Sequence, residues 1–260
     1  MDVTQALVHE RAIELGTRIA IIYGFMGAFA PLSFIIIFLR MYSRWRFSHI
    51  GLDDVFALLG FALYMGLIMA TVFATQYGLG HHIWTISEEA GVLMQKCGFT
   101  SQVLYPSALG AVKVSIVLFF IRCLPVVHDR KNALFWLASF IAVEELTFTI
   151  ALFAQCQPLS FYWDKTIEGG TCFNQPAFYY ADAALNLATD LCILSLPWIL
   201  FRKLNVSKRH RYTVVGICSL SVFTLISSIV RLPYLLDLNL SKDPTCKPGL
   251  PALFGWSVNG

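Results

Sequence analysis

Six of the polar side chains that interrupt long apolar stretches of this sequence are functional candidates, because ionisable and polar groups are costly there. They are Lys113, Glu144, Glu145, Asn186, Asp190 and Arg231. At 1.5 Å per residue, Lys113 would lie about 15 Å and Asp190 about 18 Å below the same end of their helices. Because the two depths match, we predict a Lys113–Asp190 ion pair near the middle of the apolar layer.

Two polar stripes run along predicted helices in the second half of the chain. Asp182, Asn186 and Asp190 follow one another at four-residue steps, which places them on one face of a helix. The segment 213–235 carries a similar stripe of Thr224, Ser227, Ser228 and Arg231. Such stripes must face the interior of a bundle, because lipid offers no hydrogen-bond partners. We expect either a ligand-binding network of Lys113, Asn186, Asp190 and Arg231 or a polar core that only fixes helix packing.

Three carboxyl groups are candidates for catalysis. Glu144 and Glu145 are adjacent, so they project about 100° apart on a helix and would both reach the interior only at its edges. A protonated carboxyl at either position, or at Asp190, would act as a general acid on a bound substrate. The sequence leaves the existence of an enzymatic activity undecided.

The composition indicates a membrane protein. Hydrophobic residues make up 57% of the 260 residues and charged residues only 13%, whereas soluble domains contain about 25% charged residues. Six segments reach the length of about 20 residues that crosses a hydrocarbon core. They are residues 19–39, 55–75, 103–121, 133–154, 178–200 and 213–235. We therefore predict an all-α, polytopic membrane helix bundle with six full spans and a partial seventh apolar segment at 250–258.

The distribution of charge predicts the topology. Loops 40–51, 122–132 and 201–212 hold eleven Lys and Arg residues against six on the opposite side. Short basic loops stay cytosolic, so the amino terminus is predicted to be outside or lumenal, in the plasma membrane or an endomembrane. Residues 1–18 would be an outer segment with a short interfacial helix, 19–235 the bundle, and 236–260 an outer segment or a truncated last helix. The basic inner loops would anchor the bundle or face a cytosolic partner.

Two short motifs have structural interpretations that compete with metal binding. Asp53 and Asp54 would cap the second helix and pair with Arg44 or Arg46, and a diphosphate-type DDxxD site lacks its third acid. His81 and His82 lie in a glycine-containing turn without further ligands. We predict no metal site and, because the basic residues form no continuous face, no nucleic-acid partner.

The cysteines agree with this topology. Cys97, Cys156, Cys172 and Cys246 fall on the predicted outer side, so two disulfides are expected in one of three pairings. The segment 156–172 is predicted to be an ordered loop with a cysteine at each end. Asn239, in a glycosylation sequon on the same side, is expected to carry glycan, whereas Asn205 is on the cytosolic side.

Several of these stretches together resemble the fungal rhodopsin-domain family of integral membrane proteins, which includes the satratoxin-cluster membrane protein and pathogenicity receptor-like proteins. The resemblance is carried by LRMYSRWRFSHIGLDD, YGLGHH, Lys113-Val-Ser115 with Arg122, CQPLSFYWD with GGTC, NLATD and Ile229-Val-Arg231-Leu232. It implies a helical bundle, usually of seven spans, in a fungal membrane, with many members encoded beside secondary-metabolite genes. Retinal is not expected, because the buried lysine is Lys113 on the third helix and not on the last; we predict no cofactor.

Two functions from different classes remain in competition. The chain would bind or convert a lipophilic small molecule in its bundle during secondary-metabolite biosynthesis. Alternatively, it would be a receptor-like sensor of an extracellular small molecule or surface cue. A transporter is less favoured, because the sequence shows no inverted repeat or pair of broken helices.

Overall fold

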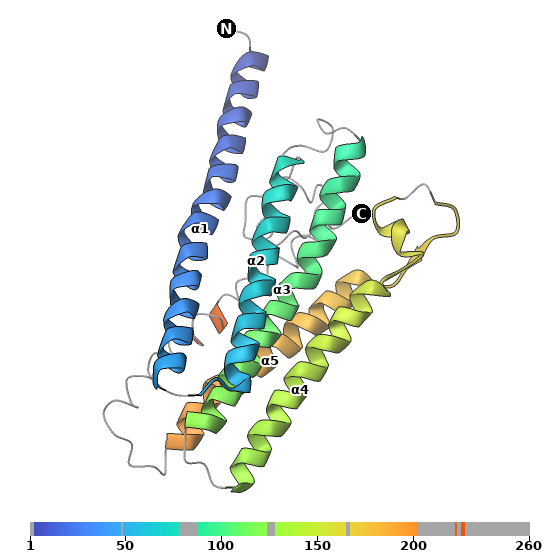
Figure 1. Ribbon diagram of the computed structural model, residues 1–260. Coiled ribbons are helices and arrows are strands. Elements are labelled where there is room, and N and C mark those ends of the chain that lie inside the picture. The colour runs from blue at the N-terminus through green and yellow to red at the C-terminus, as the bar shows by residue number, and fades with distance from the viewer. Residues whose placement is uncertain are drawn as a thin grey trace.

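The protein is all-α over the residues that its computed structural model describes (Figure 1). These are residues 3–47, 49–77, 88–123, 128–164 and 167–201, together with Val222, Leu225 and Ile226. Their side chains are described from Tyr23 onward, except at 88, 123, 128–130, 176 and 197–201. Five helices and one small hairpin form this part of the chain. The predicted all-α class is confirmed.

The elements follow one another along the chain in a simple up-and-down order. They are α1 (Val3–Phe47), α2 (Leu52–Gln76), α3 (Glu88–Cys123), α4 (His128–Phe153), β1 (Cys156–Gln157), the 3-10 helix η2 (Leu159–Tyr162), β2 (Thr171–Cys172) and α5 (Gln175–Phe201). The two strands are antiparallel, with Cys156 opposite Cys172 and Gln157 opposite Thr171. We call the end of the bundle that carries this hairpin the hairpin end.

Four of the described helices are long and apolar enough to cross a membrane. They are Tyr23–Phe47, Leu52–Gln76, Glu89–Arg122 and Lys131–Phe153, which correspond to the first four predicted spans. Helix α5 covers the fifth predicted span but is not among these four. The sixth predicted span, 213–235, lies outside the described residues except for three positions, so six crossings remain a prediction.

Helix α1 corrects two boundaries drawn from the sequence. It runs without a break through 45 residues, roughly 68 Å at 1.5 Å per residue. The separate interfacial helix expected within residues 1–18 is therefore its first turns, and most of the loop expected at 40–51 is its last turns. The charge of this segment suggested a loop, but arginine is a good helix former and a long arginine side chain reaches polar groups from a helix end.

Close packing of α2, α3 and α4 builds the core, while α1 stands against α2 (Figure 1). Gly60 lets α2 approach α3, since a Cβ at this position would run into the Val112 side chain. The main hydrophobic cluster joins α3, α4 and α5 in the half of the bundle away from the hairpin end. Its buried members are Val114, Val117, Phe120, Leu134, Ala138, Ile141, Ile193 and Leu196. This cluster holds the three helices that carry the polar residues discussed next.

Candidate functional site

The buried amino group of Lys113 lies at the centre of a polar group between α3 and α5. Its Nζ is 2.9 Å from Asp190 Oδ1, and it donates hydrogen bonds to Thr189 Oγ1 at 2.9 Å and to the Asn186 carbonyl at 3.0 Å. It also contacts Asn186 Oδ1. The predicted Lys113–Asp190 ion pair is therefore present.

These contacts use the full donor capacity of Lys113. An ammonium group has three N–H donors and no acceptor, and the four oxygens around Nζ occupy all three. Thr189, the residue before Asp190, also accepts a hydrogen bond from Lys113, and the sequence analysis did not predict this contact. The role of Lys113, Asn186 and Asp190 in ligand binding stays a prediction.

The two glutamates of α4 lie beside this lysine but differ in burial. Glu145 is 8% exposed, whereas Glu144 is half-buried, so the expectation that both lie at the edge holds only for Glu144. Glu145 packs against α3 at Gly110, where any Cβ would overlap the Glu145 side chain. Each glutamate has one buried oxygen, Oε2, without a hydrogen-bond partner among the described residues. Their candidacy as catalytic groups remains a prediction.

Electrostatic interactions connect the glutamates to the rest of the polar group. The Glu145 carboxyl is buried and lies within electrostatic reach of Lys113, Glu144, Asp182 and Asp190. The Glu144 carboxyl lies within electrostatic reach of Lys113 and of the same two aspartates. Helices α3, α4 and α5 thus bring one lysine and four carboxyl groups together, and we call this set the Lys113 cluster. Its members are Lys113, Glu144, Glu145, Asp182, Asn186, Thr189 and Asp190.

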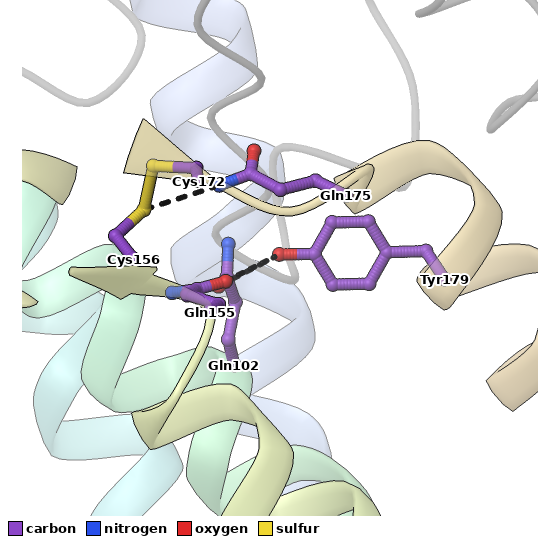
Figure 2. Close-up of a disulfide and its surroundings, with 6 residues drawn as sticks. All are labelled: Gln102, Gln155, Cys156, Cys172, Gln175 and Tyr179. Carbon is purple, nitrogen blue, oxygen red and sulfur yellow. Dashed lines mark hydrogen bonds between the residues drawn. A yellow bond between two sulfur atoms is a disulfide. The ribbon is translucent and has the colours of Figure 1, made fainter. Parts of the chain in front are cut away.

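A second polar layer lies under the hairpin and was not predicted from the sequence. Gln102 Nε2 donates to the Tyr162 hydroxyl at 2.9 Å, and the Tyr179 hydroxyl donates to Gln102 Oε1 at 3.2 Å and to Gln155 Oε1 at 3.4 Å. Figure 2 shows Tyr179 of α5 pointing at both glutamine side chains next to the disulfide. Burial raises the pKa of Tyr162, although the bond from Gln102 acts to lower it. This layer closes the hairpin end with neutral hydrogen-bonding groups.

The number of residues between the two polar layers is similar along α3, along α5 and from α4 into the start of the hairpin. Gln102 and Lys113 are eleven residues apart on α3, and Tyr179 and Asp190 are eleven apart on α5. On the antiparallel α4 side, Gln155 and Glu145 are ten apart. At 1.5 Å per residue, the Lys113 cluster lies about 16 Å from the hairpin layer. Gln102 and Gln155 interrupt otherwise apolar segments at matching heights. This pattern could have predicted the hairpin layer from the sequence.

A disulfide joins Cys156 to Cys172 at the two ends of the hairpin loop. The Gln175 side chain donates to Cys156 Sγ at 3.9 Å (Figure 2). Cys97 has no disulfide partner among the described residues, and Cys246 lies outside them, so the second predicted disulfide stays a prediction. The loop expected from the sequence is thus closed by its own terminal cysteines.

Replacing Cys156 and Cys172 together by serine is expected to lower the free energy of unfolding by about 2–3 kcal/mol, because the bond restricts the unfolded chain. The thermal unfolding midpoint of the purified protein in nanodiscs measures the change. Cys192→Ser is the matched control, since Cys192 is an exposed cysteine that forms no disulfide among the described residues, and it should leave the midpoint unchanged. Equal midpoints for the double variant and the control would contradict this role.

The opposite end of the bundle, which we call the arginine end, holds a cluster of charges around Asp53 and Asp54. Asp54 is fully buried and accepts a hydrogen bond from the Gly51 backbone at 3.1 Å, which caps α2 as predicted. Arg40 of α1 contacts Asp54 at 3.0 Å and Asp53 at 3.1 Å. Arg44 contacts the same two carboxylates, at 3.3 Å to Asp53 and 3.5 Å to Asp54.

A third arginine comes from α3. Arg122 lies 2.9 Å from Asp53 and 3.3 Å from Asp54, and it also donates to the His49 carbonyl. Of the two arginines predicted to pair with the aspartates, Arg44 does so, whereas the guanidinium of Arg46 lies over the Phe47 ring. The aspartates therefore do more than cap α2, because their ion pairs also connect α2 to α1 and to α3.

Other predicted positions lie outside the described residues. They are His81, His82, Asn205, Arg231, Asn239, Cys246, the polar stripe of 213–235 and the apolar segment 250–258. Among the residues that the structure does describe, no three His, Cys, Asp or Glu side chains come close enough to hold a metal ion.

Long apolar helices with a buried charged cluster define this chain as a multi-pass membrane protein of the helix-bundle class. The model of the fungal rhodopsin domain matches residues 39–258. The chain belongs to this fungal family of membrane proteins, as the motifs in its sequence indicated.

Curated relatives come from three fungi. A SAT4 family membrane protein of Emericella nidulans is 28% identical over 203 residues, which are 71% of this chain and 52% of the relative. Fugralins biosynthesis cluster protein 2 of Gibberella zeae is 25% identical over 82% of this chain and 55% of the relative. A polyenoic acids biosynthesis gene cluster protein of Metarhizium anisopliae, Ba17b, is 26% identical over 74% of this chain and 53% of the relative.

The chain spans about half the length of these curated relatives. No solved structure matches it significantly. Two of the relatives are named after gene clusters for secondary metabolites, so the family includes members associated with such pathways.

Proposed function

We propose that this protein binds a lipophilic small molecule inside its helix bundle as part of fungal secondary-metabolite biosynthesis. The names of two relatives support the pathway. The Lys113 cluster supports binding in the bundle, because charged groups in a membrane interior are costly and are retained mainly where they serve a function.

The observation that carries the proposal is the buried Oε2 atom of Glu145. It has no hydrogen-bond partner among the described residues, although buried polar atoms almost always have one. A ligand group that donates a hydrogen bond would satisfy it. If the bound molecule is also converted, the same carboxyl group is placed to exchange a proton with it.

The proposed orientation puts the hairpin end outside or in a lumen and the arginine end in the cytosol. The disulfide at the hairpin end suits an oxidising compartment, and the arginines gathered at the other end follow the positive-inside rule. The membrane would be the plasma membrane or an endomembrane. We keep the division into an outer segment 1–18, a six-span bundle 19–235 and an outer segment 236–260.

A receptor-like sensor is the second candidate, and one observation favours it. The charges at the arginine end join three helices through two residues of α2, so a shift of α1 or α3 caused by a ligand would alter the surface offered to a cytosolic partner. In a sensor the same bundle site would bind the signal.

Metabolite profiling of a deletion strain tests the proposal. We expect an intermediate to accumulate, and microsomes that contain the protein should bind or convert it. Complementation with Glu145→Gln should fail to restore the profile, while Glu168→Gln, a matched change at an exposed glutamate of the hairpin loop, should restore it. An unchanged profile together with an altered transcriptional response would contradict the proposal and favour the sensor.

A further inference from the structure

Among the residues that the structure describes, the Lys113 cluster contains four carboxyl groups and one basic group. Lys113 is the one basic residue of the described parts of α3, α4 and α5 that lies at this depth, since the others are near the helix ends. Its amino group is saturated by Asp190, Asn186 and Thr189. The carboxyl groups of Glu144 and Glu145 also lie near this lysine.

This imbalance restricts the chemistry of a ligand. A ligand that only accepts hydrogen bonds finds no spare donor on Lys113, and an anionic ligand would meet carboxyl groups there instead of a free positive charge. A donor finds the buried Oε2 atoms of Glu144 and Glu145, which have no partner among the described residues. The site therefore favours a positively charged donor, which forms the stronger, charge-assisted kind of hydrogen bond with a carboxylate.

Aromatic side chains lie one helical turn from these carboxyls. Phe148 of α4 follows Glu145 by three residues, and Phe178 of α5 precedes Asp182 by four. Their ring centroids are 5.1 Å apart. Aromatic faces attract organic cations, and the hydrophobic cluster around Val117 and Ile193 lies on the other side of the charges. A cation with an apolar body suits such surroundings better than a hydrated metal ion, for which the described residues offer no set of three ligands.

We propose that the Lys113 cluster selects a lipophilic organic cation, such as a protonated amine, with Glu145 as the main charge partner and Glu144 as the second. This deepens the proposed function and rests on it. The role of Lys113 becomes positional: it holds Asp190 and the Asn186 turn of α5 in place and does not contact the ligand.

Binding of matched probes to the purified protein in nanodiscs tests the charge preference. The probes share the adamantane cage and differ in their polar group: 1-aminoadamantane, 1-adamantanol and adamantane-1-carboxylate. The same three groups on a naphthylmethyl skeleton cover a second shape. We expect an amine to bind more tightly than its neutral and anionic counterparts. Glu145→Gln should raise its apparent Kd roughly tenfold or more, Glu144→Gln should raise it less, and Glu168→Gln should leave it unchanged.

The thermal midpoint of each variant without probe shows that it is folded, so a loss of binding can be assigned to the site. Tighter binding of an alcohol or a carboxylate would overturn the cation preference and leave the proposed function standing. Equal binding of the amine to the wild type and to Glu145→Gln would overturn the assignment of Glu145. Failure of both amines to bind would overturn the cation proposal, and a normal metabolite profile in the deletion strain would separately overturn the proposed function.

Discussion

Asp190→Asn alone is expected to lower the free energy of unfolding by about 3–5 kcal/mol, because it leaves the buried Lys113 ammonium without its counter-charge. Lys113→Met should have an effect of similar size, since it removes the ammonium group that pairs with the buried Asp190 carboxylate. For a chain of this length, such a loss would lower the thermal midpoint by about 10 °C. Unfolding of the purified variants in nanodiscs, followed by circular dichroism, measures it.

The double variant Lys113→Met/Asp190→Asn should be more stable than either single variant. With both charges removed, no unpaired ion remains at this pair, and the amide introduced at position 190 can hydrogen-bond to neighbouring oxygens. Lys131→Met and Glu168→Gln form a control pair that share no contact, so their effects should add. Additive losses at positions 113 and 190 would show that the ion pair contributes nothing as a pair.

The Lys113–Asp190 pair could be predicted because depth along a helix follows from residue counting. The direction in which each side chain points could not be predicted, because it depends on how neighbouring helices rotate and approach. Because position 110 is a glycine, the Glu145 side chain has room to pack against α3, whereas the Glu144 side chain stays at the edge. Nothing in the sequence near Glu144 and Glu145 distinguishes the two.

Contacts between residues far apart in the sequence could not be predicted from the sequence either. The sequence places Asp53 and Asp54 beside Arg44 and Arg46, and local spacing alone favours both pairs equally. The structure adds Arg40 from the same helix and Arg122, which is 69 residues from Asp53 in sequence. Arg122 joins because α3 ends beside the start of α2, a consequence of the close α2–α3 packing at Gly60. The hairpin layer of Gln102, Gln155, Tyr162 and Tyr179 similarly needs three helices to be aligned first.

The arginine end leads to the second large prediction. Replacing Asp53 and Asp54 together by asparagine is expected to lower the free energy of unfolding by about 3–5 kcal/mol, because three guanidinium groups would then face one another without a carboxylate. The loss should appear first as separation of α1, which contacts α2 through the side chains of Arg40, Arg44, Tyr23 and Phe34. Faster hydrogen exchange of the α1 backbone would report that separation.

Arg46→Gln is the matched control, because the Arg46 guanidinium lies over Phe47 and away from the aspartates. It removes one positive charge from the same helix end but should leave both the midpoint and the exchange of α1 unchanged. Arg122→Gln should have an intermediate effect, since Arg40 and Arg44 would still neutralise both carboxylates. If Asp53→Asn/Asp54→Asn unfolds at the same temperature as Arg46→Gln, the buried aspartates only cap α2, and the contacts with α1 and α3 contribute nothing to stability.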